Sequence, residues 1–328
     1  MNIGPRAARA CAVLAAWLLT ACQTIPDLSA WDRSTRDVGT AVIDGFYSTA
    51  GVNADLAARL RRVDDPALLA RADRYAAASK VVSDRAEDYE TLFGAMADYS
   101  ASLAAIAKAS ANSDENVEAV AGSLNQFIGA LGGTPLVGAG FELGKLLTSE
   151  IIKVRAARDF ASAVQAADPI VGSVCDLLLK DLASAKAVLA TKEEPIRTAI
   201  SLPFEDRLKY RTLLEQRRTT LQTKVRNNSP DTSLSQVPEA SEIQKVDVLL
   251  RDTDTWYVPL AKDIDQALIT LSRTEQLIVQ TSRAVGAWRA SHASLAVAIQ
   301  QKRAPESAKL AALAVRIRDL AAEIRKGN

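Results

Sequence analysis

Small and apolar residues recur at alternating steps of three and four along two long stretches of the chain. This spacing places a narrow stripe on one face of a helix and is typical of long helices that pack together. The first stretch is expected to be one helix running from Asp65-Pro66, an N-cap followed by proline at the first helical position, to about Ala111. Its stripe comprises Leu68, Ala72, Tyr75, Ser79, Val82, Ala86, Tyr89, Phe93, Met96, Ser100, Leu103 and Ala107. The second stripe comprises Ile243, Val246, Leu250, Thr253, Tyr257, Leu260, Ile264, Ala267, Leu271, Thr274, Ile278, Thr281, Val285 and Trp288.

Glycines and prolines predict where the other helices begin, break or end. We expect a first helix from near Trp31 to Arg62, interrupted around Gly45 and Gly51. Further helix starts are predicted at Asp168-Pro169, Glu194-Pro195 and Ala304-Pro305. Pro259 lies inside the second stripe and predicts a kink or a restart there. The polar stretch 226–239, which contains two prolines, is the predicted exposed loop.

Composition sets the fold class. Helix-forming residues fill nearly the whole chain, aromatic residues make up only 5% of it, and no stretch alternates apolar and polar residues ahead of a hairpin turn. We therefore predict an all-α fold over residues 31–328, an elongated antiparallel helical bundle with long coiled-coil-like helices.

One internal segment, 119–152, stands out because no charged residue lies between Glu118 and Glu142. Gly132-Gly133-Thr134-Pro135 divides it, which predicts a tight helical hairpin. One interpretation is that the hairpin is buried in the core of the bundle. The other is that its tip contacts a membrane or a partner, although each arm of about 12 residues is shorter than a bilayer core. The residues that would make this contact are Phe127, Ile128, Leu131, Leu136, Val137 and Phe141.

Little in the sequence points to catalysis, a metal or a cofactor. His292 is the only histidine, which excludes a multi-histidine metal site and leaves few groups able to act as a base near neutral pH. Cys175 is expected to be a small buried apolar residue. Ala139 to Leu146 approaches a phosphate-binding loop but lacks its first glycine and its Ser or Thr. We therefore expect neither an enzyme nor a bound cofactor or metal.

The charges indicate which partners to expect. Residues 207–226 hold seven basic side chains and one acidic side chain, Glu215. They are interpreted as a solvated helix face paired with acidic neighbours, with a phospholipid or acidic-partner surface as the alternative. The whole chain has 40 basic and 39 acidic residues, and this balance argues against a nucleic-acid-binding protein.

The N-terminus carries a short motif with a specific order. Arg6 and Arg9 precede an apolar run from Ala10 to Leu19, and Leu19-Thr20-Ala21-Cys22 follows. The run is too short to cross a bilayer but suits a secretory signal. Together these 22 residues resemble the lipobox of bacterial lipoproteins. The resemblance implies a signal peptide at 1–21, cleavage before Cys22, lipid on Cys22 and a tether over 22–30.

These observations predict a function class rather than a reaction. We expect an outer-membrane-anchored, periplasm-facing lipoprotein that acts as a structural or protein-interaction component of the envelope, with an envelope protein as its partner. The outer membrane is favoured because the residue after the lipidated cysteine is Gln23 rather than the aspartate that commonly retains lipoproteins at the inner membrane. The alternative is a membrane-inserting protein, similar in layout to helical pore-forming toxins, that would use hairpin 119–152.

Overall fold

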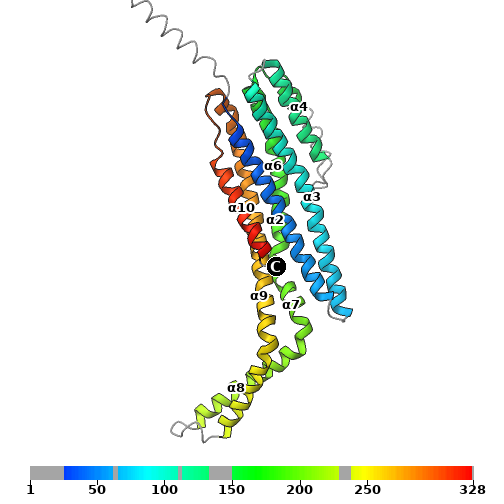
Figure 1. Ribbon diagram of the computed structural model, residues 1–328, viewed down its shortest axis with the longest axis vertical. Helices are drawn as coiled ribbons and strands as arrows, with labels where there is room; N and C mark the ends of the chain where they lie inside the picture. The colour runs from blue at the N-terminus through cyan, green and yellow to red at the C-terminus, as the bar shows by residue number, and fades with distance from the viewer. Residues whose placement is uncertain (1–25, 62–65, 110–112, 133–149, 229–237, 327–328) are drawn as a thin grey trace, which may run out of the picture. The chain divides into compact units, whose positions relative to one another are not determined.

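The computed structural model describes residues 26–61, 66–109, 113–132, 150–228 and 238–326. Within these ranges the chain is helical almost throughout and contains no strand (Figure 1). The predicted all-α class is therefore confirmed. The helices are α2 (Ser29–Arg61), α3 (Pro66–Ala109), α4 (Ser113–Gly132), α6 (Phe160–Ala190), α7 (Glu193–Ser201), α8 (Glu205–Asn228), α9 (Pro238–Gln300) and α10 (Ala308–Lys326), with a 3-10 turn η1 (Leu202–Phe204).

Contacts divide the chain into two compact units. Unit 1 comprises the described parts of Met1–Gly51, Ser79–Ala187 and Thr274–Lys326. Unit 2 comprises the described parts of Val52–Ala78 and Val188–Arg273. The sequence pattern had suggested a single bundle over 31–328 and gave no sign of this division, because α2, α3 and α9 each contribute residues to both units.

Several predicted helix breaks are wrong. α2 continues through Gly45 and Gly51, and α9 continues through Pro259 without the restart that was one of the two predicted outcomes there. α6 begins at Phe160 and contains Pro169, because the cap is Asp159, whose Oδ1 accepts a hydrogen bond from the Ser162 backbone N–H at 2.7 Å. The interior prolines each remove one helical hydrogen bond, and the remaining helix and its packing tolerate that loss.

Other predicted boundaries agree with the structure or lie close to it. α3 begins at Pro66, α7 begins at Glu193, and α10 begins at Ala308, shortly after Pro305. α9 ends in a Schellman motif, in which the Arg303 N–H bonds the Ala298 carbonyl and Lys302 has a φ of 54°. Of the predicted loop 226–239, residues 226–228 belong to α8 and 238–239 to α9, and 229–237 lie outside the described residues.

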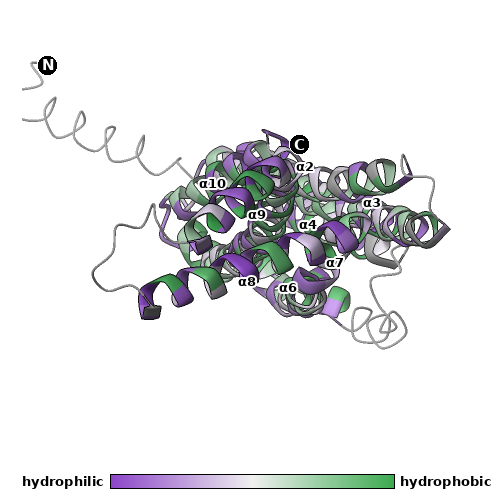
Figure 2. Cartoon of the chain, turned by 90° about the horizontal axis from the view of Figure 1, so that it is seen from below, coloured by the Kyte–Doolittle hydropathy of each residue, from purple (hydrophilic) through white to green (hydrophobic). Residues whose placement is uncertain are grey.

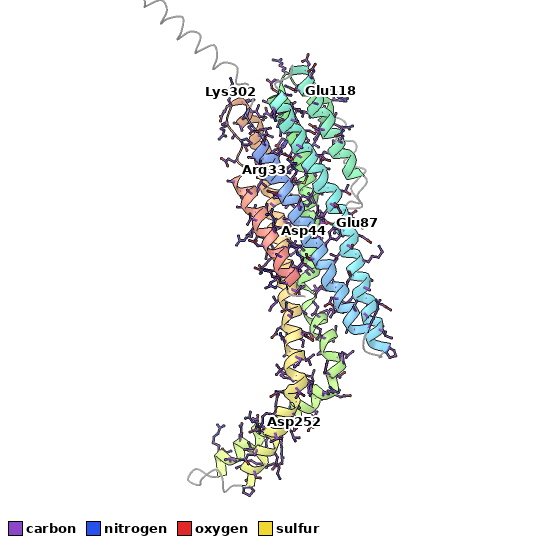
Figure 3. The ribbon with its side chains drawn as sticks, viewed as in Figure 1. Arg33, Asp44, Glu87, Glu118, Asp252 and Lys302 are labelled. Atoms are coloured by element: carbon purple, nitrogen blue, oxygen red, sulfur yellow. The ribbon has the colours of Figure 1, made fainter. Side chains whose placement is uncertain are left out.

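The helices of unit 1 pack around an aromatic core. The predicted stripe of α3 is buried from Ala86 to Ala107, with Tyr89, Phe93, Met96 and Leu103 each at most 1% exposed. The rings of Trp31 and Trp288 stack with centroids 6.1 Å apart. Charged residues such as Arg33, Asp44, Glu87 and Glu118 project from the outer faces instead (Figure 3).

Pairs of contacting residues give the helix directions within unit 1. α2 runs antiparallel to α9, because Trp31 bonds Ser291 whereas Gly45 lies against Leu277. α2 and α10 run in the same direction, because Asp37 pairs with Arg318 and Asp44 with Arg325. The predicted antiparallel arrangement therefore holds for α2 and α9 but not for α2 and α10, which both run opposite to α9.

Buried polar groups in unit 1 are joined to one another. The indole N–H groups of Trp31 and Trp288 donate to Ser291 Oγ at 2.9 Å and to Thr35 Oγ1 at 3.1 Å. Ser100 Oγ donates to Asp32 Oδ1 at 3.1 Å. Each of these side chains is buried, so the bonds offset the cost of removing polar atoms from water and fix the register of the helices.

Unit 2 has much less core. One cluster joins Leu60 and Ala72 with the partly buried Leu56, Tyr75 and Leu202. A second cluster joins Leu214, Leu221 and Val246 between α8 and α9, with Ile243 and Leu250 packed against it. Hydrophilic and hydrophobic residues are interspersed along α8, where the hydrophilic ones predominate (Figure 2).

Candidate functional site

A pocket of about 380 Å³ lies in unit 2 where three segments of the chain meet. They are 53–60 from α2, 196–204 from α7 and η1, and 255–270 from α9. The volume falls within the range of about 300–1,000 Å³ that is usual for small-ligand sites. The Tyr75 hydroxyl donates to the Pro195 carbonyl at 3.3 Å and thereby ties α7 to the first turns of α3.

The walls of the pocket are largely apolar and partly aromatic. The rings of Phe204 and Trp256 stack with centroids 6.0 Å apart and planes 11° apart. Leu60 and Leu260 are buried at its base, whereas both aromatic residues are only partly buried. The remaining apolar lining residues are Leu56, Ile196, Ile200, Pro203, Pro259 and Ala267.

The polar lining of the pocket holds both acceptors and donors, because the amides of Asn53 and Gln266 and the hydroxyl of Thr270 lie beside carboxylates. Asp55 and Asp263 contribute carboxylates, and no Lys, Arg or His is found among the described lining residues. Thr255 and Pro259 line the same wall and are four positions apart on α9. Because proline has no N–H, the Thr255 carbonyl receives no hydrogen bond from position 259.

Ion pairs join α8 to the first part of α9. Arg211 pairs with Asp254, Arg218 pairs with Asp247, and Arg217 pairs with Glu242. Arg211 pairs with a residue later in α9 than Arg218 does, so the two helices are antiparallel. The prediction that acidic neighbours pair with the basic stretch 207–226 is confirmed for these three residues.

Arg211 also stacks on an aromatic ring. Its guanidinium carbon lies 3.9 Å from the centroid of the Tyr257 ring, and its Nη1 donates to Asp254 Oδ1 at 2.6 Å. Burial opposes its charge, but hydrogen bonds and charges of Asp254 and Glu215 outweigh burial and raise the pKa of Arg211. The Arg211 guanidinium is thus held between the Tyr257 ring and the Asp254 carboxylate.

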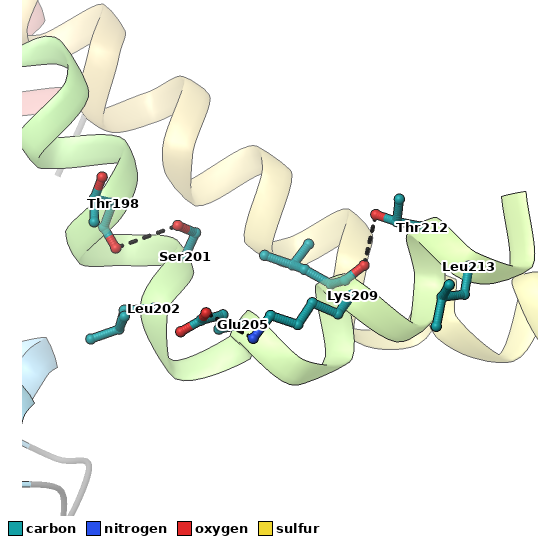
Figure 4. Close-up of a pocket in the computed structure, with 8 residues that line it drawn as sticks. Thr198, Ser201, Leu202, Glu205, Lys209, Thr212 and Leu213 are labelled. Carbon is teal, nitrogen blue, oxygen red and sulfur yellow. Dashed lines mark hydrogen bonds and ion pairs between the residues drawn. The ribbon is translucent and has the colours of Figure 1, made fainter. Parts of the chain in front are cut away.

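A second, shallower hollow of about 710 Å³ follows η1 and α8 (Figure 4). Lys209 Nζ lies 2.9 Å from Glu205 Oε1, and the hydroxyls of Ser201 and Thr212 donate to carbonyls of their own helices. Because these groups already have partners inside the hollow, it offers a ligand little beyond the apolar side chains of Leu202, Leu208 and Leu213. The pocket of about 380 Å³, which is less open than this hollow, is the better candidate site.

The residues predicted to contact a membrane or partner are only partly described. Phe127 is 1% exposed and packs against Tyr99 and Trp288, with ring centroids 5.7 and 6.3 Å away. Ile128 is half-buried, and Leu131 belongs to α4. Leu136, Val137, Phe141 and the lipidation candidate Cys22 lie outside the described residues. The described arm of hairpin 119–152 therefore packs into the core of unit 1.

His292 and Cys175 are core residues, as predicted for Cys175. Tyr99 Oη lies 3.0 Å from His292 Nε2, and His292 Nδ1 lies 2.9 Å from Asp168 Oδ1. The neutral tautomer with its proton on Nδ1 satisfies both bonds. Tyr99 and His292 are each 1% exposed, whereas the Asp168 side chain is 39% exposed, so only the carboxylate end of this hydrogen-bonded line reaches the surface. Burial raises the pKa of the Cys175 thiol to about 12, which keeps it unreactive.

The described residues were also considered as possible membrane-spanning helices and metal sites. α6 is long and apolar enough between Phe160 and Ala187 to cross a membrane by composition, but half of that window is buried in the protein and it supplies core residues such as Val171 and Leu178. No group of three His, Cys, Asp or Glu side chains that could hold a metal ion occurs there.

The sequence pattern did not predict the residues that line this pocket. Trp256 and Phe204 lie far apart along the chain, and Pro259 was interpreted only as a kink or a restart of the helix. The one available signal was the proline inside an otherwise regular stripe, flanked by Trp256 and Asp263.

Comparisons with protein-family models, with curated proteins and with solved structures found no match.

Proposed function

We propose that this protein is an outer-membrane-anchored, periplasm-facing lipoprotein whose helical body is a structural or protein-interaction component of the cell envelope. The observation that carries the proposal is the order of its first 22 residues: two arginines, an apolar run and Leu19-Thr20-Ala21-Cys22. Three acyl chains, at about 0.8 kcal/mol for each buried methylene, would exceed what stable anchoring needs.

The start of the folded body supports an anchor close to it. α2 begins at Ser29, only seven positions after Cys22, and Asp27 Oδ1 accepts a hydrogen bond from the Ser29 backbone N–H at 2.9 Å. Seven extended residues reach at most about 24 Å. A lipid on Cys22 would therefore hold α2 close to the membrane surface.

The exposed apolar residues of unit 2 support a protein partner. Leu213 on α8 is 63% exposed. Tyr210, Val248, Leu249 and Val258, on α8 and α9, are exposed as well. Single exposed apolar residues are common, but several on one two-helix hairpin with a small core are typical of an interaction surface.

Cysteine substitution tests the anchor. In cells, Cys22→Ser is expected to leave an unprocessed precursor without acyl mass, whereas Cys175→Ser, a matched control in the core, is expected to be processed and acylated normally. Gln23→Asp is expected to move the protein to the inner membrane. Acylation of Cys22→Ser would overturn the proposal.

Photocrosslinking in intact cells tests the partner. A photoreactive residue at position 213 is expected to yield a discrete adduct, and the same residue at Val81 in unit 1, which is 60% exposed, is expected to yield none. Equal adducts at both positions, or none at 213, would contradict an interaction surface on unit 2.

A further inference from the structure

We propose that the unit 2 pocket binds a small, uncharged aromatic molecule with one neutral polar group, such as an aryl alcohol. This inference does not depend on the lipid anchor, because every residue that carries it lies in unit 2. Its first support is the cavity itself, which has about 380 Å³ of space and walls from three separate segments of the chain. A cavity of this size accommodates a small organic ligand.

The second support is the aromatic wall. The Phe204 and Trp256 rings stack with planes 11° apart, and both residues line the pocket while remaining only partly buried. Aromatic rings prefer offset-stacked or edge-to-face contacts with one another. A planar aromatic ligand can therefore add a further ring to this pair.

The third support is the apolar surface of the other walls. Leu60 and Leu260 are 5% and 4% exposed, and the half-buried lining residues include Leu56, Ile196 and Ile200. A ligand body that covers these side chains exchanges water for apolar surface, which is favourable. The same walls make it costly to bring in a charged group that gains no partner of opposite charge.

The fourth support is that the charged groups around the pocket are already engaged within the chain. Asp55 and Asp263 each take part in an interaction with other groups of the protein. The guanidinium carbon of Arg207 lies 6.0 Å from the centroid of the Phe204 ring. Both signs of charge are therefore present and occupied, and a neutral ligand enters without competing for either.

The polar lining suits a neutral group that both donates and accepts hydrogen bonds. Gln266 is half-buried, and its amide offers two N–H donors and an acceptor oxygen. A ligand hydroxyl donates one hydrogen bond and accepts others, so it matches this amide whichever way the amide is turned. A single hydroxyl on an aromatic body therefore meets both the apolar and the polar part of the pocket.

Matched probes test the proposal by titration calorimetry on the full chain in zwitterionic lipid nanodiscs, with empty nanodiscs subtracted. They are 2-(1-naphthyl)ethanol, the cation 2-(1-naphthyl)ethylamine, the anion 1-naphthylacetate and the saturated 2-(1-decahydronaphthyl)ethanol. The naphthyl alcohol is expected to bind at least about fivefold more tightly than either ion, because the pocket does not replace the hydration that an ion loses. It is expected to bind about threefold more tightly than the saturated alcohol, because only the aromatic ring can join the stack.

The outcomes that would overturn the proposal are distinct. Equal or tighter binding of either ion would contradict a site for uncharged ligands. Equal binding of the saturated alcohol would contradict recognition by the ring pair. No binding of the naphthyl alcohol would contradict both.

Variants locate the binding. Trp256→Leu removes one ring of the pair but keeps an apolar side chain, and it is expected to weaken binding of the naphthyl alcohol at least about threefold and that of the saturated alcohol less. Tyr210→Leu, at an exposed aromatic residue of α8 outside the pocket lining, is expected to change neither. Ala267→Trp, which fills the pocket, is expected to abolish binding of both alcohols.

Circular dichroism shows which variants keep their helices, and the comparison of Trp256→Leu with Tyr210→Leu decides the question even if Ala267→Trp does not fold. If Trp256→Leu loses helicity, Phe204→Leu removes the other ring of the pair and takes its place. Identical affinities for the naphthyl alcohol in the pocket variant and in Tyr210→Leu would refute the site.

Discussion

Unit 1 and unit 2 share three helices, α2, α3 and α9, but differ in how much of their surface is buried. Unit 1 buries stacked tryptophans, a row of tyrosine and phenylalanine rings and the polar groups that bond them. Unit 2 has two small clusters and a pocket lined by apolar, aromatic and acidic residues, and exposed large apolar residues occur in both units. The difference suggests that stability is concentrated in unit 1, whereas the candidate ligand site lies in unit 2.

The largest expected effect comes from placing a charge in the core of unit 1. Phe127→Asp puts a carboxylate where the side chain is 1% exposed, and it should lower the free energy of unfolding by about 4 kcal/mol or more. Leu213→Asp on the exposed face of unit 2 should change it by less than about 0.5 kcal/mol. Urea unfolding followed by circular dichroism measures both. If Phe127→Asp remained as stable as the native chain, the buried packing of α4 would be wrong.

Removing a single tyrosine hydroxyl should give a smaller difference in stability between the two units. Tyr99→Phe removes the partner of His292 Nε2 inside unit 1 and should cost about 1–3 kcal/mol. Tyr210→Phe, on the exposed face of α8, should cost almost nothing. Chemical denaturation of the two variants side by side makes the comparison. Equal losses would mean that the buried Tyr99–His292 hydrogen bond adds nothing to stability.

Two glycines of α2 should respond in opposite directions to alanine. A Cβ at Gly45 would lie 3.0 Å from Leu277 Cγ and closer still to both δ carbons, so Gly45→Ala should destabilise by about 1–3 kcal/mol. A Cβ at Gly51 would meet nothing within 4 Å, so Gly51→Ala should stabilise by about 0.5–1 kcal/mol. Thermal melts of the two variants give the signs. Stabilisation by Gly45→Ala would contradict the close approach of α9 to α2.

The smallest expected effect is a helix cap with a pH signature. Backbone and side-chain hydrogen bonds from Ser162 hold the pKa of Asp159 below its ordinary 3.8. A lowered folded pKa means that the cap contributes fully above pH 3.8 and is lost as the pH falls through the folded value. Asp159→Ala should therefore cost about 1 kcal/mol at pH 7, and this deficit should shrink in acid.

Asp159→Asn keeps a cap acceptor that does not titrate, so its stability relative to the native chain should rise in acid. In unit 2 the residue before α7, Lys192, makes no side-chain cap bond. A deficit of Asp159→Ala that did not vary with pH would show that the charge of Asp159 has no part in the cap.

The sequence predicted periodic features of the fold well and features of long-range assembly poorly. The stripe of α3 from Ala86 to Ala107 and the end of the α9 stripe at Trp288 are buried because a spacing of three and four is a local property of a helix. Pro169 and Gly45 were misjudged as breaks because tertiary packing overrides local preference. The pocket was missed because its walls come from three distant segments, and no single residue type marks such a meeting.

Hydrogen exchange of the full chain tests this division most directly. We expect amides of the unit 1 core, such as those of 171–178 and 284–288, to exchange far more slowly than those of α8. Equal protection in the two units would contradict the account.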